Sequence, residues 1–220
     1  MHENRHILEK KKQELQQLIF AMSGMATEAI SQVTNCLNST DCDKAEAIIR
    51  HDQDINEKFH EAESTAVFII ASQQPVAIDL REVVAAMRIS AEIERIADHA
   101  ANVAAIRLQM GQQDLAEVSL SAVSELGAKV LAIYNHALEA YQKMDVEMAR
   151  KTQAMEEEID GLIEPLTNAL FDKMKASPDS VEDGSRMLWI SHNFERIADR
   201  ATNIAEQVVY VITANEESLN

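Results

Sequence analysis

Two segments of the chain, Ile89–Ala104 and Ile190–Ala205, repeat one pattern of residues. Ten of the sixteen aligned positions are identical, whereas random residue usage would give about one match. The segments that precede them also align, and Asp52 of the first falls opposite Glu156 of the second. The chain is therefore a tandem duplication, and each copy must form one unit that packs against the other.

Few residues in this chain favour turns. Its 220 residues include five Gly and three Pro, and aromatic residues make up 4%. Sheet proteins need many turns and favour aromatic and β-branched residues, whereas long helices need neither. Hydrophobic residues make up 46%, which is enough for a packed core. The composition therefore predicts an all-α fold.

Apolar residues recur at steps of three and four along most of the chain, which is typical of amphipathic helices. In the second expected helix this stripe includes Ile48, Ile55, Phe59 and Ile69. The expected helices cover residues 4–37, 42–72, 79–110, 114–143, 146–176 and 181–213. Asp79 with Glu82, and Ser180 with Asp183, are expected to cap the third and sixth helices, and the tail from Asn215 onward is expected to fray.

The expected helices are long and the connections between them are short. A helix of about 30 residues spans roughly 45 Å, and short loops force neighbouring helices to lie antiparallel. Each copy is therefore expected to be an up-down-up three-helix bundle, with residues 1–110 in the first and 111–220 in the second. The duplication predicts two tandem bundles that pack side by side with pseudo-twofold symmetry.

The chain is strongly acidic, with 37 acidic residues against 20 basic ones and a formal net charge of −17. This field repels nucleic acid and anionic membranes, and it attracts cations and basic partner surfaces. An acidic surface that only maintains solubility is the alternative. Cys36 and Cys42 are the only cysteines. They are too few and too apolar in setting for a disulfide framework, and their spacing fits no zinc motif. With a polar N-terminus and no run of about 18 apolar residues, the chain is expected to be cytoplasmic and not membrane-spanning.

Each copy carries two carboxylates four residues apart on its last helix. They are Glu94 and Asp98 in the first copy, and Glu195 and Asp199 in the second. Residues at this spacing share a helix face, where like charges repel by a few tenths of a kcal/mol. Two explanations remain open. The adjacent arginines, Arg95 and Arg196, neutralise the acids in an internal salt bridge, or the carboxylates bind a hard metal ion.

Three further residues extend these candidate sites. Asp52 and Glu156 interrupt the apolar stripes of the second and fifth helices, and a carboxylate in a core-facing position is costly unless it is paired or ligates something. Each either faces an arginine of the neighbouring helix or adds a ligand to the carboxylate pair. His192 lies one turn before Glu195 on the same face.

No pattern in the sequence indicates a nucleophile. It contains no glycine-rich phosphate loop and no Ser-His-Asp or Cys-His arrangement. Glu57 and His60 match the Glu-x-x-His of di-iron bundles, but the second copy has Gly161 and Glu164 at those positions, and that architecture needs two such motifs. We therefore do not expect an enzyme.

Three segments resemble the PhoU family: Glu94–Asn102 (ERIADHAAN), Glu195–Glu206 (ERIADRATNIAE) and Gln74–Arg81 (QPVAIDLR). The resemblance covers essentially the whole chain in its length, duplication and motif positions. It departs where Arg200 replaces a histidine that is frequent in the family, and where Asn56 replaces an acid.

The resemblance implies a cytoplasmic negative regulator of the phosphate-starvation response. Such a protein links the ATPase subunit of the phosphate ABC transporter to a sensor histidine kinase, and dimers are common. Family members carry multinuclear clusters of iron or other metals, zinc among the candidates here, on faces that map to the two Glu-x-x-x-Asp pairs. Asn102 and Asn203 match the same motif. A metalloenzyme or metal-storage bundle built on the carboxylate clusters, and a purely structural bundle, are the alternatives.

Overall fold

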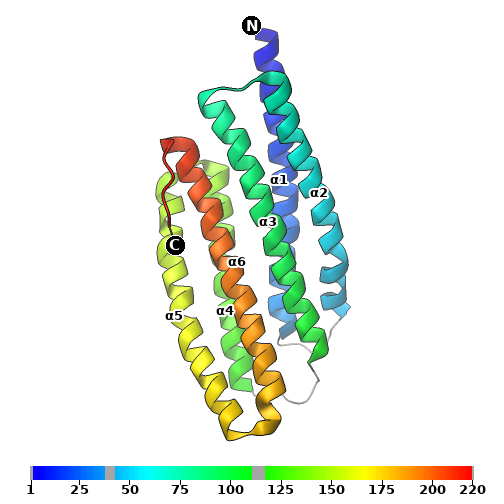
Figure 1. Cartoon of the computed structure of the whole chain (residues 1–220), viewed down its shortest axis with the longest axis vertical. Coiled ribbons are helices and arrows are strands. Elements are labelled where there is room, and N and C mark those ends of the chain that lie inside the picture. The colour runs from blue at the N-terminus through cyan, green and yellow to red at the C-terminus, as the bar shows by residue number, and fades with distance from the viewer. Residues whose placement is uncertain (1, 38–42, 111–116, 220) are drawn as a thin grey trace.

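The computed structural model describes residues 2–37, 43–110 and 117–219, and these residues form six α-helices and one short 3₁₀ helix with no strand (Figure 1). The α-helices are α1 (His2–Leu37), α2 (Asp43–Gln73), α3 (Ala77–Gln109), α4 (Glu117–Lys143), α5 (Val146–Ala176) and α6 (Val181–Thr213). The 3₁₀ helix η1, Pro178–Ser180, leads into α6. Across the described ranges, no helix has both the length and the apolar character needed to cross a membrane. The all-α prediction is confirmed.

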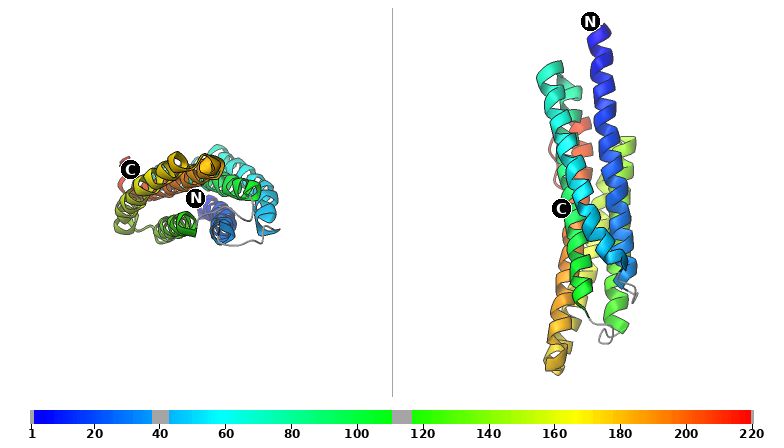
Figure 2. Two further views of the ribbon diagram at one scale, coloured as in Figure 1. Left: turned by 90° about the horizontal axis from the view of Figure 1, so that it is seen from below. Right: turned by 90° about the vertical axis from the view of Figure 1, so that its right-hand side faces the viewer.

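The helices form two bundles that pack along their length. Helices α1, α2 and α3 contact one another, as do α4, α5 and α6, and the bundles meet where α3 packs on α6 and α1 on α4. Seen end-on, α5, α6, α3 and α2 form one curved layer, and α4 and α1 lie on its concave side (Figure 2). The last helices of the two copies are therefore neighbours in the middle of the layer.

One glycine is required where the two bundles meet. A Cβ atom on Gly127 of α4 would lie 2.7 Å from Oγ1 of Thr34 in α1 and 3.0 Å from Cζ of Phe194 in α6. Both distances are shorter than ordinary van der Waals contacts, so a larger residue would push the three helices apart. By contrast, no heavy atom lies within 4 Å of a Cβ built on Gly161 of α5.

Asp79 does not cap α3, contrary to the sequence prediction. Helix α3 begins earlier, at Ala77, and its N-cap residue makes no side-chain hydrogen bond. Asp79 is instead buried, and its carboxylate accepts hydrogen bonds from Arg5 (2.7 Å) and Lys12 (2.6 Å) of α1. Lys12 also pairs with Glu82. The two carboxylates therefore bind α1 to α3.

Ser180 is the N-cap residue of α6, as predicted, but its side chain does not cap the helix. The Ser180 hydroxyl donates to the carbonyl oxygens of Lys173 and Ser177, at 3.1 and 2.7 Å, and makes no cap hydrogen bond to α6. Asp183 pairs with Arg186 one turn further along the same helix. The Ser180 side chain therefore stabilises the turn that precedes α6 and not the first turn of α6.

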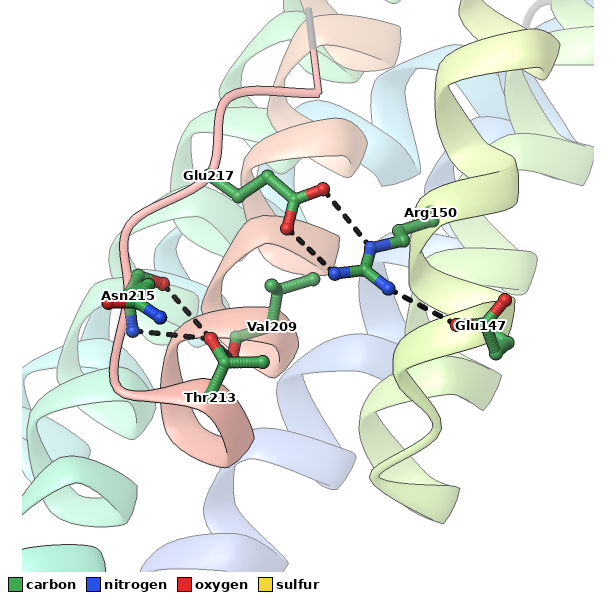
Figure 3. Close-up of polar contacts among 6 residues, drawn as sticks. All are labelled: Glu147, Arg150, Val209, Thr213, Asn215 and Glu217. Atoms are coloured by element: carbon green, nitrogen blue, oxygen red, sulfur yellow. Dashed lines mark hydrogen bonds and ion pairs between the residues drawn. The ribbon is translucent and has the colours of Figure 1, made fainter.

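The C-terminal tail packs against α5 and α6 (Figure 3). The prediction that it frays is therefore wrong. Both carboxylate oxygens of Glu217 accept from the Arg150 guanidinium of α5, at 3.1 and 3.0 Å. Leu219 is only 2% exposed, and its amide donates to Glu206 of α6 at 2.8 Å. A bidentate ion pair and a buried leucine thus hold the tail in place.

Candidate functional site

Carboxylates from neighbouring helices meet at equivalent places in the two copies. In the first, Asp52 of α2 lies against Asp98 of α3, and Glu94 is close enough to interact with both. We call Asp52, Glu94 and Asp98 the first carboxylate cluster. In the second, Glu156 of α5 lies against Asp199 of α6, with Asp160 and Glu195 beside them. We call Glu156, Asp160, Glu195 and Asp199 the second carboxylate cluster.

Asp52 and Glu156 thus lie against acids, not against an arginine of the neighbouring helix. Asp160 belongs to the second cluster although the sequence argument did not select it as a ligand. It lies four residues after Glu156, so the helical spacing that identified the other pairs also applies to it. Its counterpart in the first copy is Asn56, whose amide donates to Asp52 at 3.4 Å. The second cluster therefore has one more carboxylate than the first.

In the first cluster Asp52 and Glu94 are partly buried, whereas Asp98 is exposed. Burial raises the pKa of Asp52, and the neighbouring Asp98 raises it further. The pKa of Glu94 is also raised, first by burial and then by Asp98. Oδ1 of Asp52 and Oδ1 of Asn56 are both buried and accept no hydrogen bond from the described residues. Unpaired buried oxygens cost free energy, so this cluster has unused capacity to bind a cation.

The second cluster is more crowded. Burial raises the pKa of Glu156 to about 7, with further contributions from Asp199 and Asp160. Asp160 is exposed, but its carboxyl is shielded enough from solvent to raise its pKa, and Glu195 raises it further. The pKa of Asp199 is raised as well, mainly by burial, although Arg196 opposes the rise. These acids hold their negative charge against an unfavourable free energy, which a bound cation would relieve.

The arginines next to the two clusters behave differently. Arg196 makes the internal salt bridge considered from the sequence: its guanidinium lies 2.8 Å from Oε1 of Glu195 and 2.9 Å from Oδ2 of Asp199. Arg95 of the first copy instead points at Glu92, at 3.6 Å. It is half exposed.

His192 lies at the rim of the second cluster. Its Nδ1 is 3.5 Å from Oε2 of Glu195, and its ring packs edge-on against Trp189, with ring centroids 5.9 Å apart. Trp189 is 62% exposed and is the only tryptophan of the chain. A nitrogen donor and an indole ring therefore lie next to the carboxylates of the second copy.

The two asparagines of the repeated motif lie apart from this carboxylate contact. Asn203 donates to Glu92 of the other copy at 3.3 Å, and Arg200 donates to the same carboxylate oxygen, also at 3.3 Å. Asn102 is exposed on α3. Glu92, for which the sequence predicts no role, thus lies at the seam between the copies and joins α3 to α6.

The residues fit a hard metal ion in their chemistry. The donors are carboxylate oxygens held on rigid helices, the set preferred by oxygen-seeking divalent and trivalent cations. Asp52, Glu94 and Asp98 would hold an ion in the first copy, and Glu156, Asp160, Glu195 and Asp199 in the second. Over the ranges that the structure describes, no three His, Cys, Asp or Glu side chains already converge as a metal site. Binding would therefore require side chains to turn toward the ion.

Fold and site together define a class: a duplicated helical-bundle protein with a carboxylate cluster in each copy. Comparison with known proteins identifies the family. The PhoU domain matches the chain twice, at residues 19–106 and 123–208, which covers most of its length. The chain belongs to the PhoU family.

Relatives match along nearly the whole chain. A PhoU homolog of Clostridium acetobutylicum, a phosphate-specific transport system accessory protein, is 29% identical across 98% of this chain and 99% of its own. A homolog of the same description from Zymomonas mobilis is 32% identical, over 92% and 85%. The crystal structure of the phosphate transport system regulatory protein PhoU from Streptococcus pneumoniae superposes with a TM-score of 0.88 at 28% identity, over 96% of this chain and 99% of that one.

Proposed function

We propose that this chain is a cytoplasmic accessory protein of phosphate-specific transport and a negative regulator of the phosphate-starvation response. It acts as a non-enzymatic adaptor between the ATPase subunit of the phosphate ABC transporter and the sensor histidine kinase, and it works as a homodimer. Membership of the PhoU family over essentially the full length supports the proposal. The net charge of −17 suits docking to basic partner surfaces.

Metal binding is the second part of the proposal. The observation that carries it is the repetition of a partly buried carboxylate cluster at the same place in both copies. In the first copy, Asp52 and Asn56 each have a buried side-chain oxygen that accepts no hydrogen bond from the described residues. A bound iron or zinc ion would neutralise the crowded acids and fix α2 against α3, and α5 against α6. The ion is thus a structural and regulatory element of the adaptor.

The pathway is tested by alkaline phosphatase output in a deletion strain grown in abundant phosphate. High output that the wild-type chain returns to a low level is the expected result. Unchanged output in the deletion strain would contradict negative regulation of the phosphate response.

The clusters are tested in the same strain with Glu94→Gln/Asp98→Asn, which keeps the side-chain shapes and removes the charges. This variant is expected to leave phosphatase output high. The matched control is Glu57→Gln/Glu61→Gln, an exposed pair at the same spacing on α2, which should repress like the wild type. Full repression by the cluster variant would show that this cluster is not needed for regulation.

A metal-dependent enzyme or a metal-storage bundle is the second candidate function. One observation favours the enzyme: in the metal-free protein the pKa of Glu156 is raised to about 7, by burial first and then by Asp199. Such a group suits a general acid or base at neutral pH when the other carboxylates, and not Glu156, hold the metal ion. Metal-loaded protein that turns over phosphate esters, with activity lost in Glu156→Gln, would support it. Storage would instead bind many more ions than the two clusters hold.

A further inference from the structure

Arg95 and Arg196 occupy matched positions in the duplicated helices but make different contacts. Arg196 bridges Glu195 and Asp199 with two short contacts, at 2.8 and 2.9 Å. Arg95 makes one long contact, at 3.6 Å, to Glu92, an acid outside the first carboxylate cluster. The side chain of Arg196 is 38% exposed and that of Arg95 52%. The duplication thus provides an internal comparison of one motif in two states.

One of the six differences between the aligned segments removes an acid one turn before the arginine. Glu92 of the first copy aligns with Asn193 of the second. Arg95 makes its ion pair with Glu92, at 3.6 Å, and reaches the cluster only through a weaker interaction that lowers the pKa of Glu94. Asn193 is neutral, and its side chain is engaged elsewhere: its amide donates to the carbonyl oxygen of Trp189 at 2.8 Å, and its oxygen lies 3.0 Å from Nδ1 of His99. With no acid at this position, Arg196 turns to the carboxylates of its own helix.

We infer that Arg196 is a built-in counter-cation that keeps the second carboxylate cluster closed to metal ions until metal is abundant, while the first cluster loads freely. The inference rests on the proposed function, in which both clusters bind metal. A metal ion that enters the second cluster must displace the guanidinium from Glu195 and Asp199, because these oxygens serve both cations. The two copies therefore respond to different metal concentrations.

The charge balance explains why Arg196 weakens metal binding at the second cluster but does not prevent it. Arg196 supplies one positive charge to a group of four carboxylates, so the cluster stays negative and still attracts a cation. Glu156 and Asp160 remain outside the two arginine contacts. A divalent or trivalent ion offers more charge than the guanidinium and can replace it at a sufficient concentration.

The only tryptophan makes the second cluster separately observable. Trp189 packs against His192, whose Nδ1 lies 3.5 Å from Glu195. Tb³⁺ is a hard trivalent ion that seeks oxygen ligands and luminesces when a nearby indole is excited. Titrating Tb³⁺ into metal-free protein while exciting Trp189 therefore reports loading of the second cluster. Equilibrium dialysis of Tb³⁺ reports loading of both, and Trp189→Phe should abolish the luminescence but not the binding.

The experiment compares wild type, Arg196→Gln and the matched control Arg95→Gln. Arg196→Gln removes two charge-assisted contacts that solvent partly screens. The Tb³⁺ concentration at the midpoint of the Trp189 signal should therefore be about tenfold lower than in the wild type. Arg95→Gln should change that midpoint little. Arg196→Lys keeps the charge but loses the two-pronged geometry, so its midpoint should fall between those of wild type and Arg196→Gln. Unchanged far-UV circular dichroism confirms that each variant folds.

The outcomes separate this inference from the proposal on which it rests. Equal midpoints in wild type, Arg95→Gln and Arg196→Gln, with Tb³⁺ bound by all three in dialysis, would overturn the role of Arg196 and leave metal binding intact. No Tb³⁺ bound by any of the three at any concentration would overturn both. A signal seen at low Tb³⁺ only in Arg196→Gln is the strongest support.

Discussion

Replacing Glu156 with Gln should stabilise the metal-free protein at alkaline pH and leave it unchanged at acidic pH. Burial, aided by Asp199 and Asp160, raises the pKa of Glu156 from 4.5 to about 7 in the folded protein. The folded state therefore binds more protons than the unfolded state between these two values. Since stability falls with rising pH wherever the folded state binds more protons, the folded protein loses stability from about pH 4.5 to about pH 7.

The size of the effect follows from the pKa change. Each pKa unit corresponds to 1.36 kcal/mol, so the rise to about 7 is worth up to about 3 kcal/mol of unfolding free energy. For a chain of this size that corresponds to roughly 6–12 °C in Tm. Gln has the shape of the protonated acid and no charge to lose. The variant should therefore equal the wild type near pH 4.5 and exceed it by about this amount above pH 7.

The assay is thermal unfolding followed by circular dichroism across this pH range, in chelator to remove bound metal. Glu157→Gln is the matched control, because it removes the same charge from the exposed neighbouring residue and should follow the wild type. If Glu156→Gln also follows the wild type at every pH, Glu156 ionises normally in the fold and the second cluster is not crowded. Added Mn²⁺ should raise the stability of the wild type above pH 7, where the metal-free protein is weakened. It should raise the stability of Glu156→Gln less.

Three further substitutions test the packing that holds the clusters in place. Asp79→Asn should cost about 1–3 kcal/mol in urea unfolding, because it removes the carboxylate that pairs with Lys12; a cost near zero would mean that α1 is not tied to α3 there. Gly127→Ala should cost about 1–3 kcal/mol, whereas Gly161→Ala, which faces open space, should gain up to about 1 kcal/mol; equal effects would refute the close helix approach. Leu219→Ala should cost about 2 kcal/mol and speed amide exchange in the tail, and unaltered exchange would show that the tail is not anchored by its leucine.

The helices and the duplication could be predicted from the sequence because both depend on local patterns. The apolar spacing and the scarcity of Gly and Pro predicted six helices. Helices α4 to α6 end at the predicted residues 143, 176 and 213. The repeated spacing of four put Glu94 with Asp98, and Glu195 with Asp199, on shared faces. The polar interruptions at Asp52 and Glu156 marked where the neighbouring helices bring further acids.

The remaining features depend on contacts between residues far apart in the chain. Asp79 has the local pattern of a cap, but Arg5 and Lys12, which bind it, come from a helix that passes nearby only in the folded protein. The tail is held by Arg150 of α5, which no local pattern connects to Glu217. These partners are properties of the tertiary packing, so sequence spacing alone did not identify them.

The difference between the two arginines also depends on a contact outside the repeated motif. Arg95 and Arg196 have identical flanking residues in the motif, so the sequence predicted one behaviour for both. The difference comes from one turn earlier, where Glu92 in one copy is Asn193 in the other. A comparison of the aligned copies for changes of charge, and not only for identities, would have pointed to this position.

The metal content of the chain, purified without chelator, tests the central claim most directly. Elemental analysis of the wild type should find iron or zinc in fixed proportion to protein. Asp52→Asn/Asp98→Asn should lose the metal of the first cluster. After dialysis against excess iron or zinc, Glu156→Gln/Asp199→Asn should lack the metal that the wild type takes up at the second. Metal-free wild-type protein that also takes up no iron or zinc on dialysis, or metal content unchanged in both variants, would contradict the account.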